Sequence, residues 1–196
     1  MKSMCLTLDQ IKKKISKKTK AILYVAVYGN ADELDLIENY CKKKKLFLIV
    51  DAAAALGSKF KSRSAGTFGK ASAISLYPAK ILGCFGDGGA VFTNDETLHK
   101  KMTSIRLHGQ IKRYEHSFIG LGARMDTLQA AILNVKIDYY NNDIKNRQRV
   151  AKKYTELLKN HIQVPIINPN KKSVWAQYSI QIKNRNLVQK KLKKNI

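Results

Sequence analysis

The first fifty residues combine two hydrophobic patterns, short continuous apolar runs and helical spacing. Residues 21–27 form an apolar run that predicts a strand buried on both faces of a sheet. Residues 32–44 place apolar side chains at helical spacing, with acidic residues first and lysines last, which suits the helix dipole. A second apolar run, 46–50, follows directly. Strand, helix and strand in this order predict a crossover unit, and therefore α/β architecture with a parallel sheet.

The same reasoning assigns the rest of the chain. The expected elements are a helix over 7–15, a turn region over 57–69, strands over 71–76 and 90–93, a helix over 95–106, a long interrupted helix over 126–159, a linker over 160–172, a strand over 177–182 and a basic helix over 186–194.

Charge and cysteine content bear on partners and compartment. The formal net charge is +23, from 37 basic and 14 acidic residues, a balance that nucleic-acid-binding proteins also have. The excess is nearly all lysine in exposed-looking runs, and no zinc finger or RNA-binding aromatic motif accompanies it. We therefore favour a solvated lysine-rich surface and keep nucleic-acid binding as a less favoured hypothesis. There is no apolar run of membrane-spanning length and no leader pattern, and the three cysteines fit no disulfide or metal-ligand spacing, so a cytoplasmic protein without membrane association or a metal site is expected.

Three residues near predicted strand ends are candidates for chemistry. Asp51 ends a predicted buried strand, where an open α/β sheet places its ligands, although a helix N-cap is an equally good interpretation of this residue alone. Lys80 lies among apolar neighbours, unlike most lysines here, and a poorly hydrated amine releases its proton more readily and can attack a carbonyl. A surface lysine on a loop is the simpler interpretation. Ser75 could donate its hydroxyl to a phosphate or satisfy a nearby backbone group.

Other loop residues give weaker signals. The glycines of 83–89 precede a strand instead of opening a helix, which argues against a dinucleotide-binding loop and for a tight turn beside Lys80. Cys84 in this loop is interpreted as packing. His108 and Arg124 lie in or beside a charged loop, where a substrate contact competes with simple solvation.

The order and spacing of these motifs resemble the DegT/StrS-type sugar aminotransferases. The resemblance covers nearly the whole chain and rests on the segments 19–22, 50–57, 75–90, 106–109, 119–132 and 175–179. It implies part of the large domain of a fold-type I pyridoxal-phosphate (PLP) dependent transferase over 1–125, a connecting helical region over 126–160, and an incomplete small α+β domain over 161–196. A chain truncated at both ends is expected.

The resemblance also implies a role for each candidate residue. Lys80 would bind PLP covalently and move the proton, Asp51 would pair with the pyridine nitrogen, and Ser75 would contact the phosphate. Tyr77, His108 and Arg124 are expected substrate contacts. The implied reaction passes an amino group from a donor, commonly glutamate, to a nucleotide-linked keto sugar, most similar to a UDP-linked 3-keto hexuronic acid on a route to surface polysaccharide. A homodimer is implied.

Two positions depart from the family pattern. The family usually has glutamine beside the cofactor where this chain has Ala54, and asparagine, reaching the neighbouring subunit's cofactor phosphate, where it has Gly122. Neither residue can supply the missing polar contact. The phosphate-binding loop and the aromatic residue that stacks on the cofactor ring would lie outside the chain. A non-catalytic remnant of a disrupted gene is therefore a rival to an active enzyme.

Overall fold

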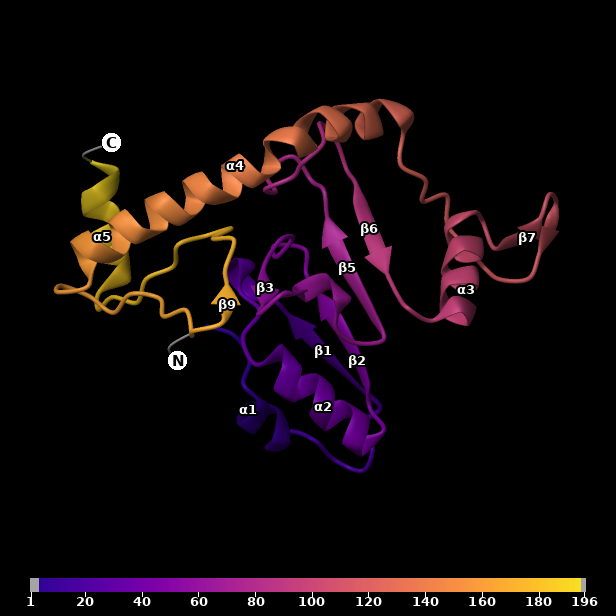
Figure 1. The fold of residues 1–196 in the computed structure, drawn as a ribbon, viewed down its shortest axis with the longest axis horizontal. Helices are drawn as coiled ribbons and strands as arrows, with labels where there is room; N and C mark the ends of the chain where they lie inside the picture. Colours follow the sequence, from indigo (N-terminus) through magenta and orange to yellow (C-terminus); the bar gives the residue numbers. More distant parts are fainter. Residues whose placement is uncertain (1–3, 195–196) are drawn as a thin grey trace.

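A four-stranded sheet forms the centre of the protein. The structure is a computed structural model that describes residues 4–194. Its strands are β1 (Ala21–Val25), β2 (Phe47–Asp51), β5 (Ala71–Ser75) and β6 (Gly89–Phe92), in the order β1-β2-β5-β6 (Figure 1). The first three are parallel, and β6 runs antiparallel to β5. The predicted α/β class with a mainly parallel sheet is confirmed.

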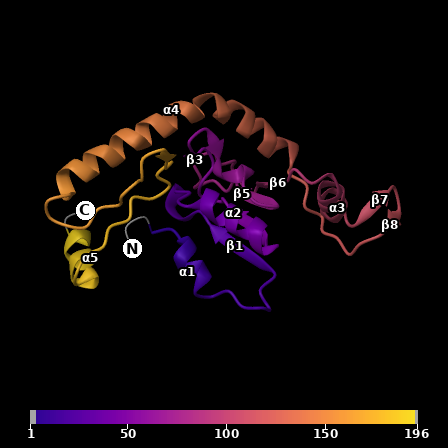
Figure 2. The ribbon, with the colours of Figure 1, turned by 60° about the horizontal axis from the view of Figure 1, so that its bottom comes forward.

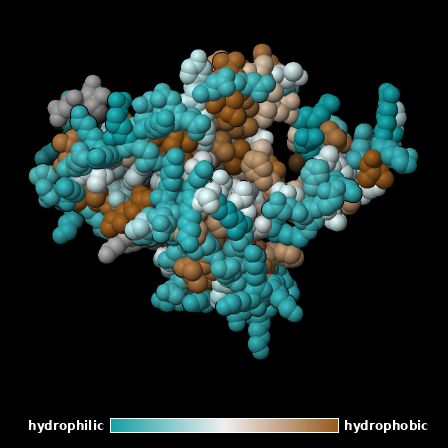
Figure 3. Space-filling view, viewed as in Figure 1, coloured by the Kyte–Doolittle hydropathy of each residue, from teal (hydrophilic) through white to brown (hydrophobic). Residues whose placement is uncertain are grey.

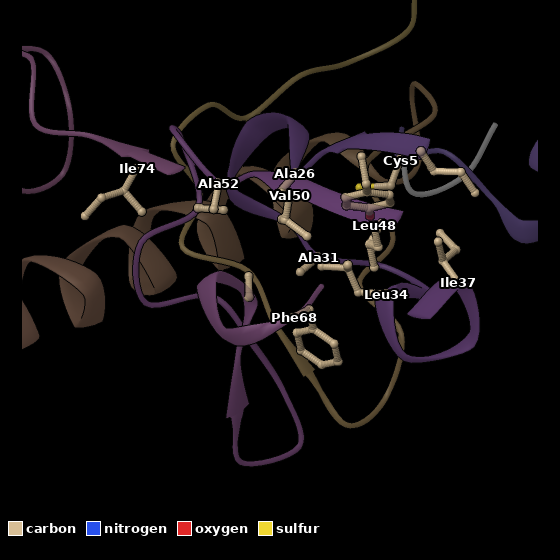
Figure 4. Packing of buried hydrophobic residues seen from close by; sticks show 14 of the residues in the cluster. Cys5, Ala26, Ala31, Leu34, Ile37, Leu48, Val50, Ala52, Phe68 and Ile74 are labelled. Carbon is tan, nitrogen blue, oxygen red and sulfur yellow. The ribbon is translucent and has the colours of Figure 1, made fainter. Parts of the chain in front are cut away.

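Helix α2 (Leu34–Lys44) covers one face of this sheet. Its Leu34 and Ile37 are fully buried and belong to one hydrophobic core with Leu48 and Val50 of β2 and with Phe68 (Figure 4). Burying each such side chain contributes about 1.5–3 kcal/mol. The crossover unit expected from the first fifty residues is therefore both the topological and the energetic centre of the fold.

The opposite face of the sheet is exposed, which corrects the prediction that β1 is buried on both faces. Leu23 is 62% exposed and Val25 43%, and their neighbours on β2, Phe47 and Ile49, are 57% and 42% exposed. The apolar run is continuous, but only alternate side chains meet α2, and no other element of residues 4–194 buries the rest. A parallel sheet ordinarily buries both faces.

Short strands and helical turns form within the predicted turn and loop regions. Residues 57–69, predicted as turns only, contain β3 (Lys59–Phe60), β4 (Arg63–Ser64) and the 3-10 turn η2 (Ala65–Thr67). Helix α1 (Leu8–Lys12) begins at the predicted cap Thr7, whose side chain accepts from Gln10 N. It is shorter than the expected 7–15 because Lys13 and Lys14 already form a turn.

An arm follows β6. It consists of α3 (Glu96–Arg106), capped by Asp95, and a hairpin of β7 (Gln110–Lys112) and β8 (Glu115–His116) that no sequence pattern predicted. Figures 1 and 2 show the arm extending away from the sheet. Helix α4 (Thr127–Leu158) then runs as one continuous helix, without the expected interruptions, and arcs over the body of the molecule.

The chain after α4 returns to the sheet. Three hydrogen bonds join it to the turn η1 (Val27–Gly29) that follows β1: Val174 N and Ser173 Oγ donate to Gly29 O at 2.8 and 3.0 Å, and Ala176 N donates to Tyr28 O at 3.0 Å. The strand predicted over 177–182 is wrong, since it has only a bridge between Gln181 and Gln163. Its alternating pattern finds no ladder partner within residues 4–194. Strand β9 (Lys171–Lys172) pairs with β3, and α5 (Arg185–Lys193) ends the described chain.

A buried ion pair fastens this returning segment. Lys171 pairs with Asp32, and the Asn168 side-chain amide donates to both carboxylate oxygens of Asp32 at 3.0 and 3.1 Å. The side chains of Lys171 and Asp32 are only 10% and 6% exposed. Charges so shielded from water attract each other strongly, and loss of either partner is costly.

Two of the lysine runs lie at one end of the sheet. The lysines of 12–20 lie between the last residue of α1 and β1, and those of 42–45 lie at the end of α2 before β2; Figure 3 shows this lower part of the molecule as largely hydrophilic. No helix among residues 4–194 is long and apolar enough to cross a membrane.

Candidate functional site

A cavity of about 520 Å³ lies at the carboxyl ends of the three parallel strands. Val25, Asp51 and Ser75, the last residues of β1, β2 and β5, all line it. The residues around them are Ala26, Val27, Tyr28, Ala53, Ala54, Leu56, Tyr77, Ala79, Lys80, Ile81, Leu82, Arg147, Ala176 and Gln177. Ligands of open α/β sheets bind at this edge, so the cavity is the candidate active site.

Asp51 presents a carboxylate to the cavity. Its Oδ1 accepts a hydrogen bond from Ala53 N at 2.9 Å, and its Oδ2 makes no hydrogen bond with the described residues. The alternative interpretation as a helix N-cap is wrong, because a turn and not a helix follows. One oxygen thus fixes the side chain and the other remains available to a ligand.

Lys80 reaches the cavity from a tightly folded loop. Its backbone N–H donates to Tyr77 O at 2.9 Å, and Cys84 N donates to Leu76 O at 2.8 Å, so the loop closes on the end of β5. The loop requires glycine at 83, because a methyl group there would lie 2.5 Å from the Tyr77 carbonyl oxygen. Lys80 Nζ makes no hydrogen bond or ion pair with the described residues. A partly buried, unpaired amine therefore lines the same cavity as Asp51.

Ser75, Ala54 and Tyr77 complete the predicted residues of this site. Ser75 Oγ accepts from Tyr77 N at 3.3 Å, which leaves its proton free to be donated to a ligand. Ala54 lines the cavity with a methyl group, and Tyr77 lines it while 52% exposed. The structure therefore brings five of the predicted site residues together.

Three further residues of the cavity were missed. Tyr28 has a φ of 59°, a conformation that non-glycine residues adopt rarely and mostly where surrounding structure enforces it. Arg147 donates from Nη1 to Trp175 O at 3.1 Å, and Gln177 follows on the returning segment. Tyr28-Gly29 after a strand was a readable turn signal. Gln177 lies in the segment 175–179 that carries the resemblance, but its place in the cavity, like that of Arg147, depends on docking of residues 173–176.

His108 and Arg124 are not brought to this cavity. Both lie at the base of the arm, where His108 N donates to Leu121 O at 3.0 Å and His116 Nδ1 lies 2.8 Å from His108 O. The His108 ring fills the space beside Gly122, since a methyl group on Gly122 would lie 2.8 Å from His108 Cε1. Among residues 4–194 there is no group of three His, Cys, Asp or Glu side chains placed to hold a metal ion.

The sequence of this chain is similar to those of known proteins. The model of the DegT/DnrJ/EryC1/StrS aminotransferase family matches residues 1–196. The chain belongs to this family. The UDP-2-acetamido-2-deoxy-3-oxo-D-glucuronate aminotransferase of Pseudomonas aeruginosa is 41% identical over 180 residues, which are 91% of this chain and 50% of that protein. The chain thus spans about half the length of the curated relatives it matches.

Solved structures of two similar proteins have the same fold. DesV of S. venezuelae superposes with a TM-score of 0.94 at 30% identity, covering 99% of this chain and 53% of that chain. The Bacillus subtilis protein NtdA, solved with bound cofactor PMP, superposes with a TM-score of 0.85 at 26% identity, covering 96% of this chain and 44% of that chain. The sheet and the helices after it therefore recur in both solved proteins.

Proposed function

We propose that this protein is a PLP-dependent aminotransferase that moves an amino group from an amino donor, glutamate, to the keto group of a nucleotide-linked sugar. The observation that carries the proposal is the convergence of Lys80, Asp51 and Ser75 on one cavity at the carboxyl edge of the sheet. An unpaired amine, a half-engaged carboxylate and a hydroxyl with a free proton are the groups that the reaction requires.

The cavity fits PLP chemically. The cofactor carries an aldehyde, a protonated ring nitrogen and a phosphate, and the cavity offers one group for each: Lys80 Nζ, Asp51 Oδ2 and Ser75 Oγ. The hydrogen bonds that these residues already make leave Lys80 Nζ, Asp51 Oδ2 and the Ser75 hydroxyl proton available to the cofactor. The similar protein NtdA, solved with bound PMP, supports the same cofactor here.

Each residue has a distinct part in the reaction. When bound, PLP takes up the donor's amino group and stabilises negative charge on the adjacent carbon. Lys80 would hold the cofactor through its amine, which when free would act as the general acid and base at the reacting carbon. Asp51 would hold the protonated ring nitrogen through a charge-assisted hydrogen bond. Ser75 would donate its hydroxyl to a phosphate oxygen.

The proposed acceptor is a UDP-linked 3-keto hexuronic acid derivative on a route to surface polysaccharide. The Pseudomonas aeruginosa relative, named for aminotransfer to such a sugar, supports this choice. The substrate is strongly anionic, and the protein's net charge of +23 favours its approach. We place the reaction in the cytoplasm, which the three free, buried cysteines support.

A homodimer is part of the proposal. The arm extends from the body, and its hairpin and the loop after it expose large apolar side chains: Ile111 is 58% exposed, Tyr114 78%, Ile119 101% and Leu121 65%. Apolar side chains grouped in this way on one projecting element mark a protein contact. A second copy that receives the arm would bring His108 and Arg124, both expected substrate contacts, near its own cavity.

The proposed reaction is tested by measuring how much of the donor loses its amino group. The folded protein, loaded with PLP and mixed with glutamate, should release 2-oxoglutarate in an amount equal to the cofactor present. Lys80→Ala should release less than about one hundredth as much over the same time, because general acid-base catalysis alone contributes on the order of 100-fold or more. Exposed Lys153→Ala serves as the matched control and should behave as the unaltered protein. Release that is independent of Lys80 would refute the proposal.

The open sheet face favours a second candidate, a protein that binds PLP without completing aminotransfer. Val25 lines the cavity and is 43% exposed, so water reaches one wall of the site. Catalysis on a cofactor depends on excluding water from the reacting groups. Cofactor absorbance that depends on Lys80, without release of 2-oxoglutarate, would identify this second function.

A further inference from the structure

The cavity contains one cation that the proposed cofactor does not use. Lys80 and Arg147 are the positively charged side chains that line it. Under the proposed function Lys80 is occupied by the cofactor and Asp51 by the ring nitrogen. Arg147, on α4, lines the same cavity and has no part in holding the proposed cofactor.

Arg147 is held firmly in place. Its Nη1 donates to Trp175 O at 3.1 Å, and the neighbouring Gln148 Oε1 accepts from the Trp175 ring nitrogen at 3.0 Å. The segment that carries Trp175 is in turn hydrogen-bonded to Tyr28 at the end of β1. The guanidinium has five N–H donors and uses one here, so a planar pair remains for a ligand.

We propose that Arg147 binds the α-carboxylate of the amino donor, an inference that rests on the proposed function. An α-amino acid carries its carboxylate on the same carbon as the amine that reacts, so both groups must enter the cavity together. A carboxylate removed from water needs a compensating partner, and a bidentate guanidinium is the strongest one proteins offer.

The donor fits this position better than the phosphates of the sugar nucleotide. The donor's carboxylate is one bond from the reacting carbon, whereas the diphosphate is separated from the keto carbon by several bonds of the sugar ring. Arg147 lines the same cavity of about 520 Å³ as Lys80, so we match it to the anion that is nearer the reacting carbon.

Two amines test this role in the PLP-loaded protein. Glutamate and 4-aminobutyrate differ only by the α-carboxylate, and the apparent Kd of each is measured from the change in absorbance of the lysine-bound cofactor. Arg147→Gln should weaken glutamate roughly 10- to 100-fold, the range of a hydrogen bond to a charged group, and leave 4-aminobutyrate unchanged. Arg147→Lys should recover part of the loss. Exposed Arg149→Gln, two residues along α4, should change neither.

The outcomes separate the two proposals. Equal weakening of both amines would mean that Arg147 only positions the Trp175 segment, and unchanged glutamate binding would mean that it does nothing for the donor, so either result overturns this inference alone. If the unaltered protein shows no lysine-bound cofactor, the proposed function fails as well, and with it the role of Arg147.

Discussion

The buried ion pair between Asp32 and Lys171 should be the most sensitive polar contact of the fold. Asp32→Asn keeps the size of the side chain but leaves the Lys171 ammonium, only 10% exposed, without its counter-charge. Removing one partner of a buried pair costs about 3–5 kcal/mol. Asparagine preserves some of the hydrogen bonding with Asn168, so we expect about 3 kcal/mol, a large share of the 5–15 kcal/mol typical of a domain.

Urea unfolding followed by circular dichroism measures this change, with Asp9→Asn as the control. Asp9 also pairs with a lysine, Lys12, but is 86% exposed, and its replacement should alter the free energy of unfolding by less than about 0.5 kcal/mol. Lys171→Met tested alone and with Asp32→Asn completes a double-mutant cycle, in which a coupling of at least about 1 kcal/mol is expected.

A loss below about 1 kcal/mol for Asp32→Asn, or no coupling with Lys171→Met, would refute this reasoning. A functional effect should accompany the loss of stability. The segment that Lys171 anchors also carries the Trp175 carbonyl that orients Arg147, so Asp32→Asn should weaken glutamate binding even under conditions where the protein stays folded.

Three further predictions concern pH, loop geometry and thiols. Burial raises the pKa of Glu38, but hydrogen bonds from Arg63, the Gly69 N–H and Lys42 outweigh this effect and hold the pKa at about 2. The stability that these contacts add is present above pH 4.5 and is lost as the pH falls from 4.5 toward 2. The urea midpoint of Glu38→Gln should therefore change less with pH across that window than the midpoint of the unaltered protein. Gly83→Ala should lower PLP affinity about 10-fold or more, read by cofactor absorbance, with an unchanged circular dichroism spectrum, because the added methyl group meets the Tyr77 carbonyl and displaces the Lys80 loop; equal affinity would contradict the described loop. Burial raises the pKa of the Cys5 and Cys41 thiols, so a disulfide reagent should modify both only after urea is added, and rapid modification of the folded protein would show that they are exposed.

Local pattern was enough to predict most of the sheet and its site. The apolar runs before Asp51 and Ser75 become neighbouring parallel strands, so the two side chains emerge at one edge because parallel strands end together. Lys80 follows only five residues after Ser75, and a short loop cannot carry it far. These three positions depend on contacts that are close in sequence or dictated by strand direction, which periodicity reports well.

Features that depend on distant packing were not predictable. Arg147 enters the cavity only because residues 173–176 dock on Tyr28 and Gly29, and no local pattern encodes a contact across more than a hundred residues. The strand expected over 177–182 alternates correctly, but alternation alone does not supply a neighbouring strand. A continuous apolar run likewise does not tell whether the second face of β1 is covered. The division at 125 and 160 and the roles of His108 and Arg124 remain predictions.

Chemical mapping of the cofactor lysine tests the central claim most directly. The folded protein is incubated with PLP, reduced with borohydride, digested and sequenced by mass spectrometry, with urea-unfolded protein treated in parallel. The proposed site predicts that the folded protein carries the reduced cofactor mainly on Lys80, that unfolding spreads the label over the exposed lysines, and that Asp51→Asn reduces the labelling of Lys80. Folded protein labelled on its lysine runs, with Lys80 unmodified, would contradict the proposed site.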